Sequence, residues 1–200
     1  MDFQAALQID PRNAEAHSAL AVNALLRGQY EQSRNEASTA LSIAPTLVGP
    51  RYTRAYANYF GAANADARAE LVDILKDPAE VERGYASVWL YFSARRAGED
   101  GAAAIAHYLP TSQQPEWPYP VLAWLTNKID FSAALAAASK DNQPDPNKQC
   151  ELYFYAGQKS LADGNVAKAR EYFQRSLDTG VVEFNEYAFS ARELQRLKAQ

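Results

Sequence analysis

The chain has 200 residues, of which 48% are hydrophobic, and this suits one or two domains or one elongated array. Alanine occurs 38 times whereas valine, isoleucine and threonine together occur 20 times, so a largely β fold is disfavoured. The net charge of −4 provides no basic field for a nucleic acid, and no apolar run reaches the roughly 18 residues of a membrane span, so we expect a soluble chain.

The N-terminal residues introduce a repeat. The pair Ala6-Leu7 is followed by Pro11, and Ala40-Leu41 is followed by Pro45, so equivalent residues are 34 positions apart. Thirty-four residues is the period of the tetratricopeptide repeat, a helical hairpin that stacks on its neighbours. Residues 1–11 match only the second helix of such a repeat, so we expect the chain to begin inside a longer protein.

Residues 14–47 form the first complete repeat. Leu20, Ala21 and Ala24 are small or apolar, which lets two helices approach closely. Gly28 can adopt the left-handed conformation that ends the first helix, and Pro45 ends the second. The segment therefore predicts one helical hairpin.

The middle of the chain carries weaker copies of this pattern. Residues 48–80 have Ala62 where the repeat has glycine and end at Asp77-Pro78, and residues 84–108 keep Gly98 at their turn. Residues 109–149 break the period, because Pro110, Pro115, Pro118 and Pro120 precede a short apolar helix near Val121 to Leu125. This stretch predicts a shortened helical pair with irregular connections.

The pattern returns near the C-terminus. Residues 150–181 carry Gly157, Gly164 and Phe173 at signature places, and residues 184–198 predict an amphipathic capping helix. Its apolar face comprises Phe184, Tyr187, Ala188, Ala191, Leu194 and Leu197, and its polar face Glu186, Arg192, Glu193, Arg196 and Lys198. An exposed partner-binding helix is the alternative. The predicted fold is all-α: one tetratricopeptide-repeat solenoid of ten to twelve antiparallel helices over residues 1–200.

Motifs of known chemistry are missing from the sequence. There is no glycine-rich phosphate loop, no G-x-S-x-G, no H-E-x-x-H and no calcium loop. The single Cys150 cannot form an internal disulfide, and His17 and His107 are interpreted as structural residues. We therefore expect a protein that is not an enzyme, with no catalytic, cofactor-binding or metal-binding residues.

The inner wall of the array is the predicted binding surface, because the first helices of stacked hairpins line a concave groove. Tyr52, Tyr56 and Tyr59 follow an i, i+4, i+7 spacing and so form one stripe, which suits peptides. Packing beneath an adjacent helix is the alternative for this stripe. The groove candidates are Glu15, Ser18, Val22, Leu25, Tyr52, Tyr56, Tyr59, Phe92 and Arg95.

A second set of aromatic residues surrounds the irregular segment. We interpret them as core residues, since the shortened helices there must fill a wide gap with few side chains, although an interface role is left open. They are Trp89, Tyr91, Phe92, Trp117, Tyr119 and Trp124.

The order of several segments resembles bacterial tetratricopeptide-repeat lipoproteins of the NlpI type. The segments are DFQAALQIDP at the start, SVWLYFSA at 87–94, EWPYPVLAWL at 116–125 and FNEYAFSARELQRL at the end. The resemblance implies a periplasmic, outer-membrane-anchored, homodimeric adaptor with no activity of its own. It also implies partners, namely murein hydrolases, notably an endopeptidase, and a tail-specific protease.

One feature of that family has no counterpart here. The lipid-bearing cysteine near the mature N-terminus is missing, and Cys150 lies in the middle of the chain. A lipid anchor, the only membrane contact expected, is therefore inferred for residues that precede Met1. The alternative interpretation is a cytoplasmic repeat module or a fragment of a larger assembly protein, and a signal sequence with a lipobox would discriminate between the two.

Overall fold

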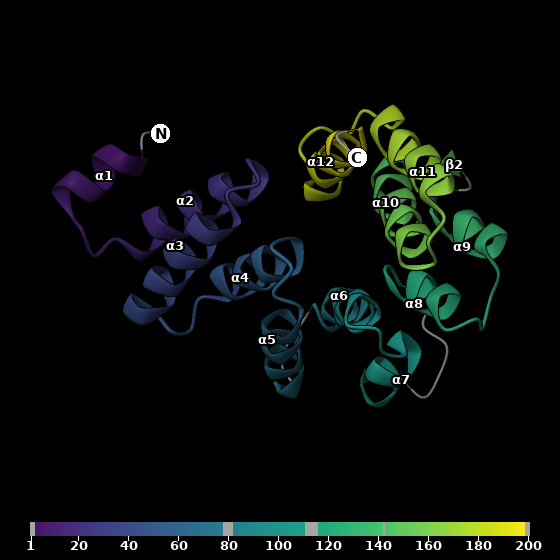
Figure 1. The fold of residues 1–200 in the computed structure, drawn as a ribbon, viewed down its shortest axis with the longest axis horizontal. Coiled ribbons are helices and arrows are strands. Elements are labelled where there is room, and N and C mark those ends of the chain that lie inside the picture. Colours follow the sequence, from purple (N-terminus) through teal and green to yellow (C-terminus); the bar gives the residue numbers. More distant parts are fainter. Residues whose placement is uncertain (1–2, 78–81, 111–115, 142, 199–200) are drawn as a thin grey trace. The chain divides into compact units, whose positions relative to one another are not determined.

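The computed structural model describes residues 3–77, 82–110, 116–141 and 143–198, and within these ranges the fold is all-α, as predicted (Figure 1). The chain divides into two compact units, residues 1–81 and 82–200, where the sequence predicted one repeat domain. We call them unit 1 and unit 2. Pro78 and Pro115 lie outside the described residues, as do residues 1–2 of the predicted half repeat.

Unit 1 is a series of five helices, each of which packs on the next. They are α1 (Phe3–Ile9), α2 (Ala14–Leu26), α3 (Tyr30–Ile43), α4 (Val48–Phe60) and α5 (Asn64–Lys76). Helices α2 and α4 begin 34 positions apart, and so do α3 and α5. The period of the sequence is therefore also the period of the backbone in this unit.

The two hairpin turns of unit 1 share one backbone conformation. Gly28 ends α2 with φ of 75°, and Ala62 follows α4 with φ of 62°. Inside the α2–α3 hairpin, the Ser33 hydroxyl donates to the carbonyl of Ala21 at 2.8 Å. His17 Nδ1 lies 2.7 Å from Glu36 Oε2, so the histidine links α2 to α3, in keeping with its predicted structural role.

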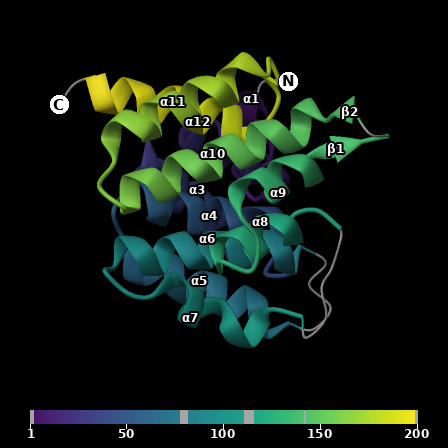
Figure 2. The same ribbon diagram turned by 90° about the vertical axis from the view of Figure 1, so that its right-hand side faces the viewer.

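Unit 2 contains the remaining elements (Figure 2). They are α6 (Arg83–Arg96), α7 (Gly101–Ile105), the 3-10 helix η1 (Ala106–Tyr108), α8 (Tyr119–Leu125), α9 (Phe131–Ala137), β1 (Ser139–Lys140), β2 (Gln143–Pro144), α10 (Pro146–Ala162), α11 (Val166–Asp178) and α12 (Asn185–Lys198). Helices α8 and α9 are the shortened pair that the sequence predicts. The small antiparallel ladder of β1 and β2 was not predicted.

The α10–α11 hairpin packs tightly because one residue lacks a side chain. A Cβ atom on Gly157 would lie 2.4 Å from the nearest ring carbon of Phe173. Next to this contact, Phe154 packs on Phe173 with ring centroids 6.1 Å apart. Phe154 and Tyr155 also join Trp89 of α6 and Phe189 of α12 in a cluster of rings whose centroids are 5.5 to 6.3 Å apart. These buried rings are the core of unit 2.

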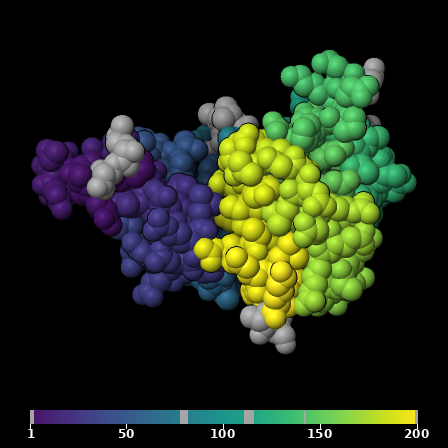
Figure 3. Space-filling model, turned by 90° about the horizontal axis from the view of Figure 1, so that it is seen from above, coloured from purple at the N-terminus to yellow at the C-terminus, as the bar shows by residue number. Residues whose placement is uncertain are grey.

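Helix α12 packs on α10 and α11, as a capping helix would (Figure 3). Its buried residues are Phe189, Ser190, Glu193 and Leu197. The buried face differs from the predicted one: Glu193, assigned to the polar face, is buried, and so is Phe189, which was not assigned to the apolar face. Of the six residues predicted for the apolar face only Leu197 is buried, and the other five are half-buried. Glu193 is buried as part of an ion pair, since it accepts from Arg96 of α6 at 3.1 Å, whereas Phe189 packs against Trp89 and Phe154.

Among the described residues, no helix combines the length and the apolar character that crossing a membrane requires.

Candidate protein-binding surfaces

The predicted groove residues of α2 differ in their exposure. Glu15 is exposed, and Ser18 and Val22 are half-buried. Leu25 is buried, with only 3% of its surface exposed, so the exposed position expected for it is wrong. Leu25 lies in the last turn of α2, where apolar residues pack inward next to the turn at Gly28.

The tyrosine stripe of α4 is mostly interior. Tyr52 is 6% exposed and Tyr59 is 1% exposed, whereas Tyr56 is half-buried, so the exposure predicted for the first two is corrected. The Tyr52 and Tyr56 rings lie 6.1 Å apart, and Tyr59 packs edge-on against Phe60 at 5.0 Å. The alternative interpretation, burial of the stripe, therefore holds for two of its three members.

The opposite side of α4 is occupied by ion pairs with α5. Arg54 binds both carboxylate oxygens of Glu70, with Nε–Oε2 of 2.8 Å and Nη2–Oε1 of 3.0 Å. Arg51 pairs with Asp73 at 3.2 Å. Because polar pairs hold this side, the large apolar area of α4 is its tyrosine side.

The two candidates from α6 also have separate environments. Phe92 is fully buried between the rings of Tyr91 and Tyr155, and its predicted place in a groove is wrong. Arg95 is half-buried and pairs at 2.8 Å with Asp163, the C-cap residue that follows α10. A short α7 follows α6, so the predicted repeat of residues 84–108 has an incomplete second helix.

A buried carboxylate joins three segments of unit 2. Glu151 of α10 accepts from the Trp117 indole at 2.7 Å and from the Tyr85 hydroxyl at 3.2 Å. Burial, followed by the charge of Glu186, raises the pKa of Glu151 to about 8. Burial likewise raises the pKa of Glu186, which accepts from the Tyr155 hydroxyl at 3.2 Å. Sequence reasoning did not single out these carboxylates.

The single cysteine is structural. Cys150 is fully buried, its Sγ lies 3.4 Å from the Ser176 hydroxyl, and burial raises the pKa of its thiol. The described residues contain no group of three potential metal-ligating side chains.

A second aromatic group lies at the surface of unit 2. It comprises Trp124 of α8, Phe131 of α9, Tyr153 of α10 and Tyr172 of α11, and we call it the α8–α11 aromatic cluster. All four side chains are half-buried, which corrects the core position expected for Trp124. Trp117 and Tyr119, which were also expected in the core, are half-buried as well. Phe131 and Tyr172 were not predicted, because the pattern of each helix alone does not show that side chains of α9 and α11 meet.

No known protein-family model matches this sequence.

Proposed function

We propose that this chain is a non-enzymatic, protein-binding adaptor built as a tetratricopeptide-repeat solenoid with a C-terminal capping helix. By its resemblance to NlpI-type lipoproteins, it is a homodimer in the periplasm whose full-length form is anchored to the outer membrane. There it brings murein hydrolases, an endopeptidase above all, together with a tail-specific protease.

The observation that carries the proposal is the repetition of the hairpin in unit 1. Both helices of the second hairpin begin 34 positions after those of the first, and both hairpin turns place their residue at positive φ, at Gly28 and Ala62. Proteins with this period use stacked hairpins to present extended surfaces to other proteins. The α10–α11 hairpin supports the same interpretation, because Gly157 and Phe173, which occupy signature places of the repeat, lie in close contact across the two helices.

The experiment compares murein cleavage with and without partners. The purified protein should lack peptidase and amidase activity on murein, and it should change the cleavage rate several-fold when a murein endopeptidase or a tail-specific protease is added. Robust cleavage by the protein alone that survives repurification would refute the proposal. Absence of any effect on both added enzymes, together with no capture of either from a periplasmic extract, would refute the partner assignment.

A further inference from the structure

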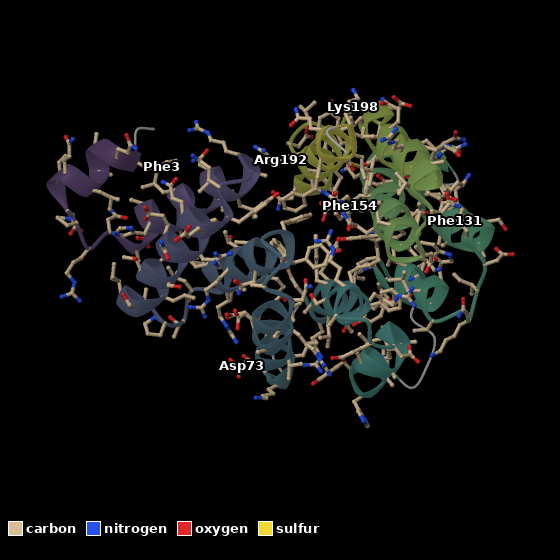
Figure 4. All side chains as sticks on the ribbon, viewed as in Figure 1. Phe3, Asp73, Phe131, Phe154, Arg192 and Lys198 are labelled. Carbon is tan, nitrogen blue, oxygen red and sulfur yellow. The ribbon has the colours of Figure 1, made fainter. Side chains whose placement is uncertain are left out.

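The α8–α11 aromatic cluster forms one continuous apolar surface. Phe131 lies at its centre, with ring centroids 5.4 Å from Trp124, 5.3 Å from Tyr172 and 6.4 Å from Tyr153. Figure 2 faces the side of unit 2 on which these helices lie side by side. Figure 4 labels Phe131 on the α9 side of α10 and the buried Phe154 on the other side. The cluster is thus separate from the core of the unit.

The hydroxyl and indole N–H groups of this cluster differ in their hydrogen bonding from those of other aromatic residues in the unit. Within the described residues, the hydroxyls of Tyr153 and Tyr172 and the indole N–H of Trp124 have no hydrogen-bond partner. By contrast, the half-buried Trp117 donates to Glu151 and the buried Tyr155 donates to Glu186. Half-exposed aromatic side chains with open donors are typical of surfaces that bind another protein.

Two cations lie against the faces of the same rings. Lys168 Nζ is 4.8 Å from the centroid of Tyr172, and Arg175 Cζ is 5.8 Å from that of Tyr153. Both pair with the exposed Glu171, at 2.8 Å and 2.9 Å, so one carboxylate is shared by two cations. These three side chains together carry a net charge of +1 on a chain whose net charge is −4. Exposed ion pairs of this kind contribute little stability, so a partner's carboxylate could replace Glu171 at small cost.

We propose that the α8–α11 aromatic cluster is a docking site for an extended, acidic segment of a partner protein that carries proline or aromatic anchors. The acidic character follows from Lys168 and Arg175. The extended conformation follows from the open donors, because only an extended segment presents free backbone carbonyls, whereas a helix engages its own. Alternate side chains of such a segment are about 6 to 7 Å apart, close to the spacing of the rings.

This inference rests on the proposed adaptor function and names the surface it would use. Its test uses a display library of random dodecapeptides selected on the whole protein, after which the enriched peptides are synthesised as probes. Enriched peptides should be rich in Asp and Glu and contain Pro, Tyr, Phe or Trp. On titration with a probe, the indole N–H signal of Trp124, assigned with Trp124→Phe, should shift more than those of Trp89 and Trp117.

Variants then locate the site. Tyr172→Ala should weaken binding at least tenfold, and Lys168→Glu combined with Arg175→Glu should do the same. Tyr172→Phe, which keeps the ring and removes only the hydroxyl, should weaken it roughly threefold and guards against a folding defect. The matched control is Tyr187→Ala, which removes a half-exposed tyrosine of α12 and should leave affinity unchanged.

The proposal is overturned if no peptide is enriched, if the enriched peptides are basic, or if their affinity is the same for the Tyr172 and Lys168/Arg175 variants as for the natural sequence. The adaptor function can fail separately. Peptide binding with these dependences but no effect on murein cleavage refutes the adaptor function alone. An effect on cleavage that Tyr172→Ala leaves intact refutes the docking site alone.

Discussion

The turn residue Ala62 holds a backbone conformation that suits glycine better. Its φ of 62° crowds Cβ against the backbone, which costs about 1 kcal/mol, and Gly28 avoids this cost at the equivalent turn. We expect Ala62→Gly to raise the free energy of unfolding by about 0.5 to 1 kcal/mol, measured by urea denaturation. The control Ala69→Gly, at an exposed position inside α5, should lower it by a similar amount. A decrease for both variants would contradict this account of the turn.

The contact between Gly157 and Phe173 predicts that a methyl group added at Gly157 destabilises the fold. In Gly157→Ala the new Cβ would overlap the Phe173 ring, so α10 and α11 must separate. We expect a loss of about 1 to 3 kcal/mol in unfolding free energy. In a double-mutant cycle, Gly157→Ala should lower the unfolding free energy less in a Phe173→Leu background, which lacks the ring, than in the natural sequence. Equal costs in both backgrounds would show that the ring is not responsible.

Individual residues also show which features of the fold can be predicted from the sequence. Gly28 and Gly98 were correctly assigned to turns, because a left-handed residue leaves a local signal in the sequence. The burial of Leu25 was missed, and Phe92 was assigned both to the groove and to the core, because periodicity gives the face of a helix but not what covers that face. The α8–α11 aromatic cluster was missed for the same reason, since its four residues come from four different helices.

Helices α6 and α10 and the segment at Trp117 meet at the buried Glu151, and this predicts an unusual pH dependence. The pKa of its carboxyl, ordinarily 4.5, is raised to about 8, first by burial and then by Glu186, with Asp145 a smaller contributor. Between these values the folded state keeps a proton that the unfolded state releases. The free energy of unfolding should therefore fall as the pH rises from about 4.5 to about 8, and level off above it.

The variant Glu151→Gln isolates this effect, because the amide keeps an oxygen for the Trp117 indole and cannot ionise. We expect it to be more stable than the natural sequence at pH 8.5 by at least about 1 kcal/mol, with a shallower slope between pH 5.5 and 8.5. Some slope should remain, because burial also raises the pKa of Glu186. Denaturation at several pH values measures this. The exposed Glu171→Gln should keep the full slope, and a steeper slope for Glu151→Gln would contradict the assignment.

Element boundaries were predictable, whereas the pairs that join elements were not. The positions of α2 to α5 followed from the 34-residue period and from proline and glycine. Trp117 and Glu151 are 34 residues apart in the sequence, and Arg96 and Glu193 are 97 residues apart. No local sequence pattern therefore predicts either pair. The burial of Glu193, which the sequence analysis assigned to the polar face of α12, is a consequence of the second pair.

At the scale of the whole molecule, unit 2 has its own aromatic core. The rings of Trp89, Phe154 and Phe189 come from α6, α10 and α12, which are the first, second and last long helices of the unit. Residues 82–200 are enough chain to bury a core of this kind. We infer that this segment is a folding unit.

A fragment of residues 82–200 should therefore fold without residues 1–81. We expect a helical far-ultraviolet circular dichroism spectrum, a near-ultraviolet signal from the packed Trp89 indole, and one cooperative thermal transition. The variant Trp89→Ala removes the largest ring of the core and should cost about 3 to 5 kcal/mol, enough to abolish the transition in the fragment. Trp124→Ala, at the half-exposed surface cluster, is the matched control and should lower the transition temperature less. A fragment that is helical but lacks the near-ultraviolet signal and binds hydrophobic dyes would contradict the prediction, because its rings would not be packed.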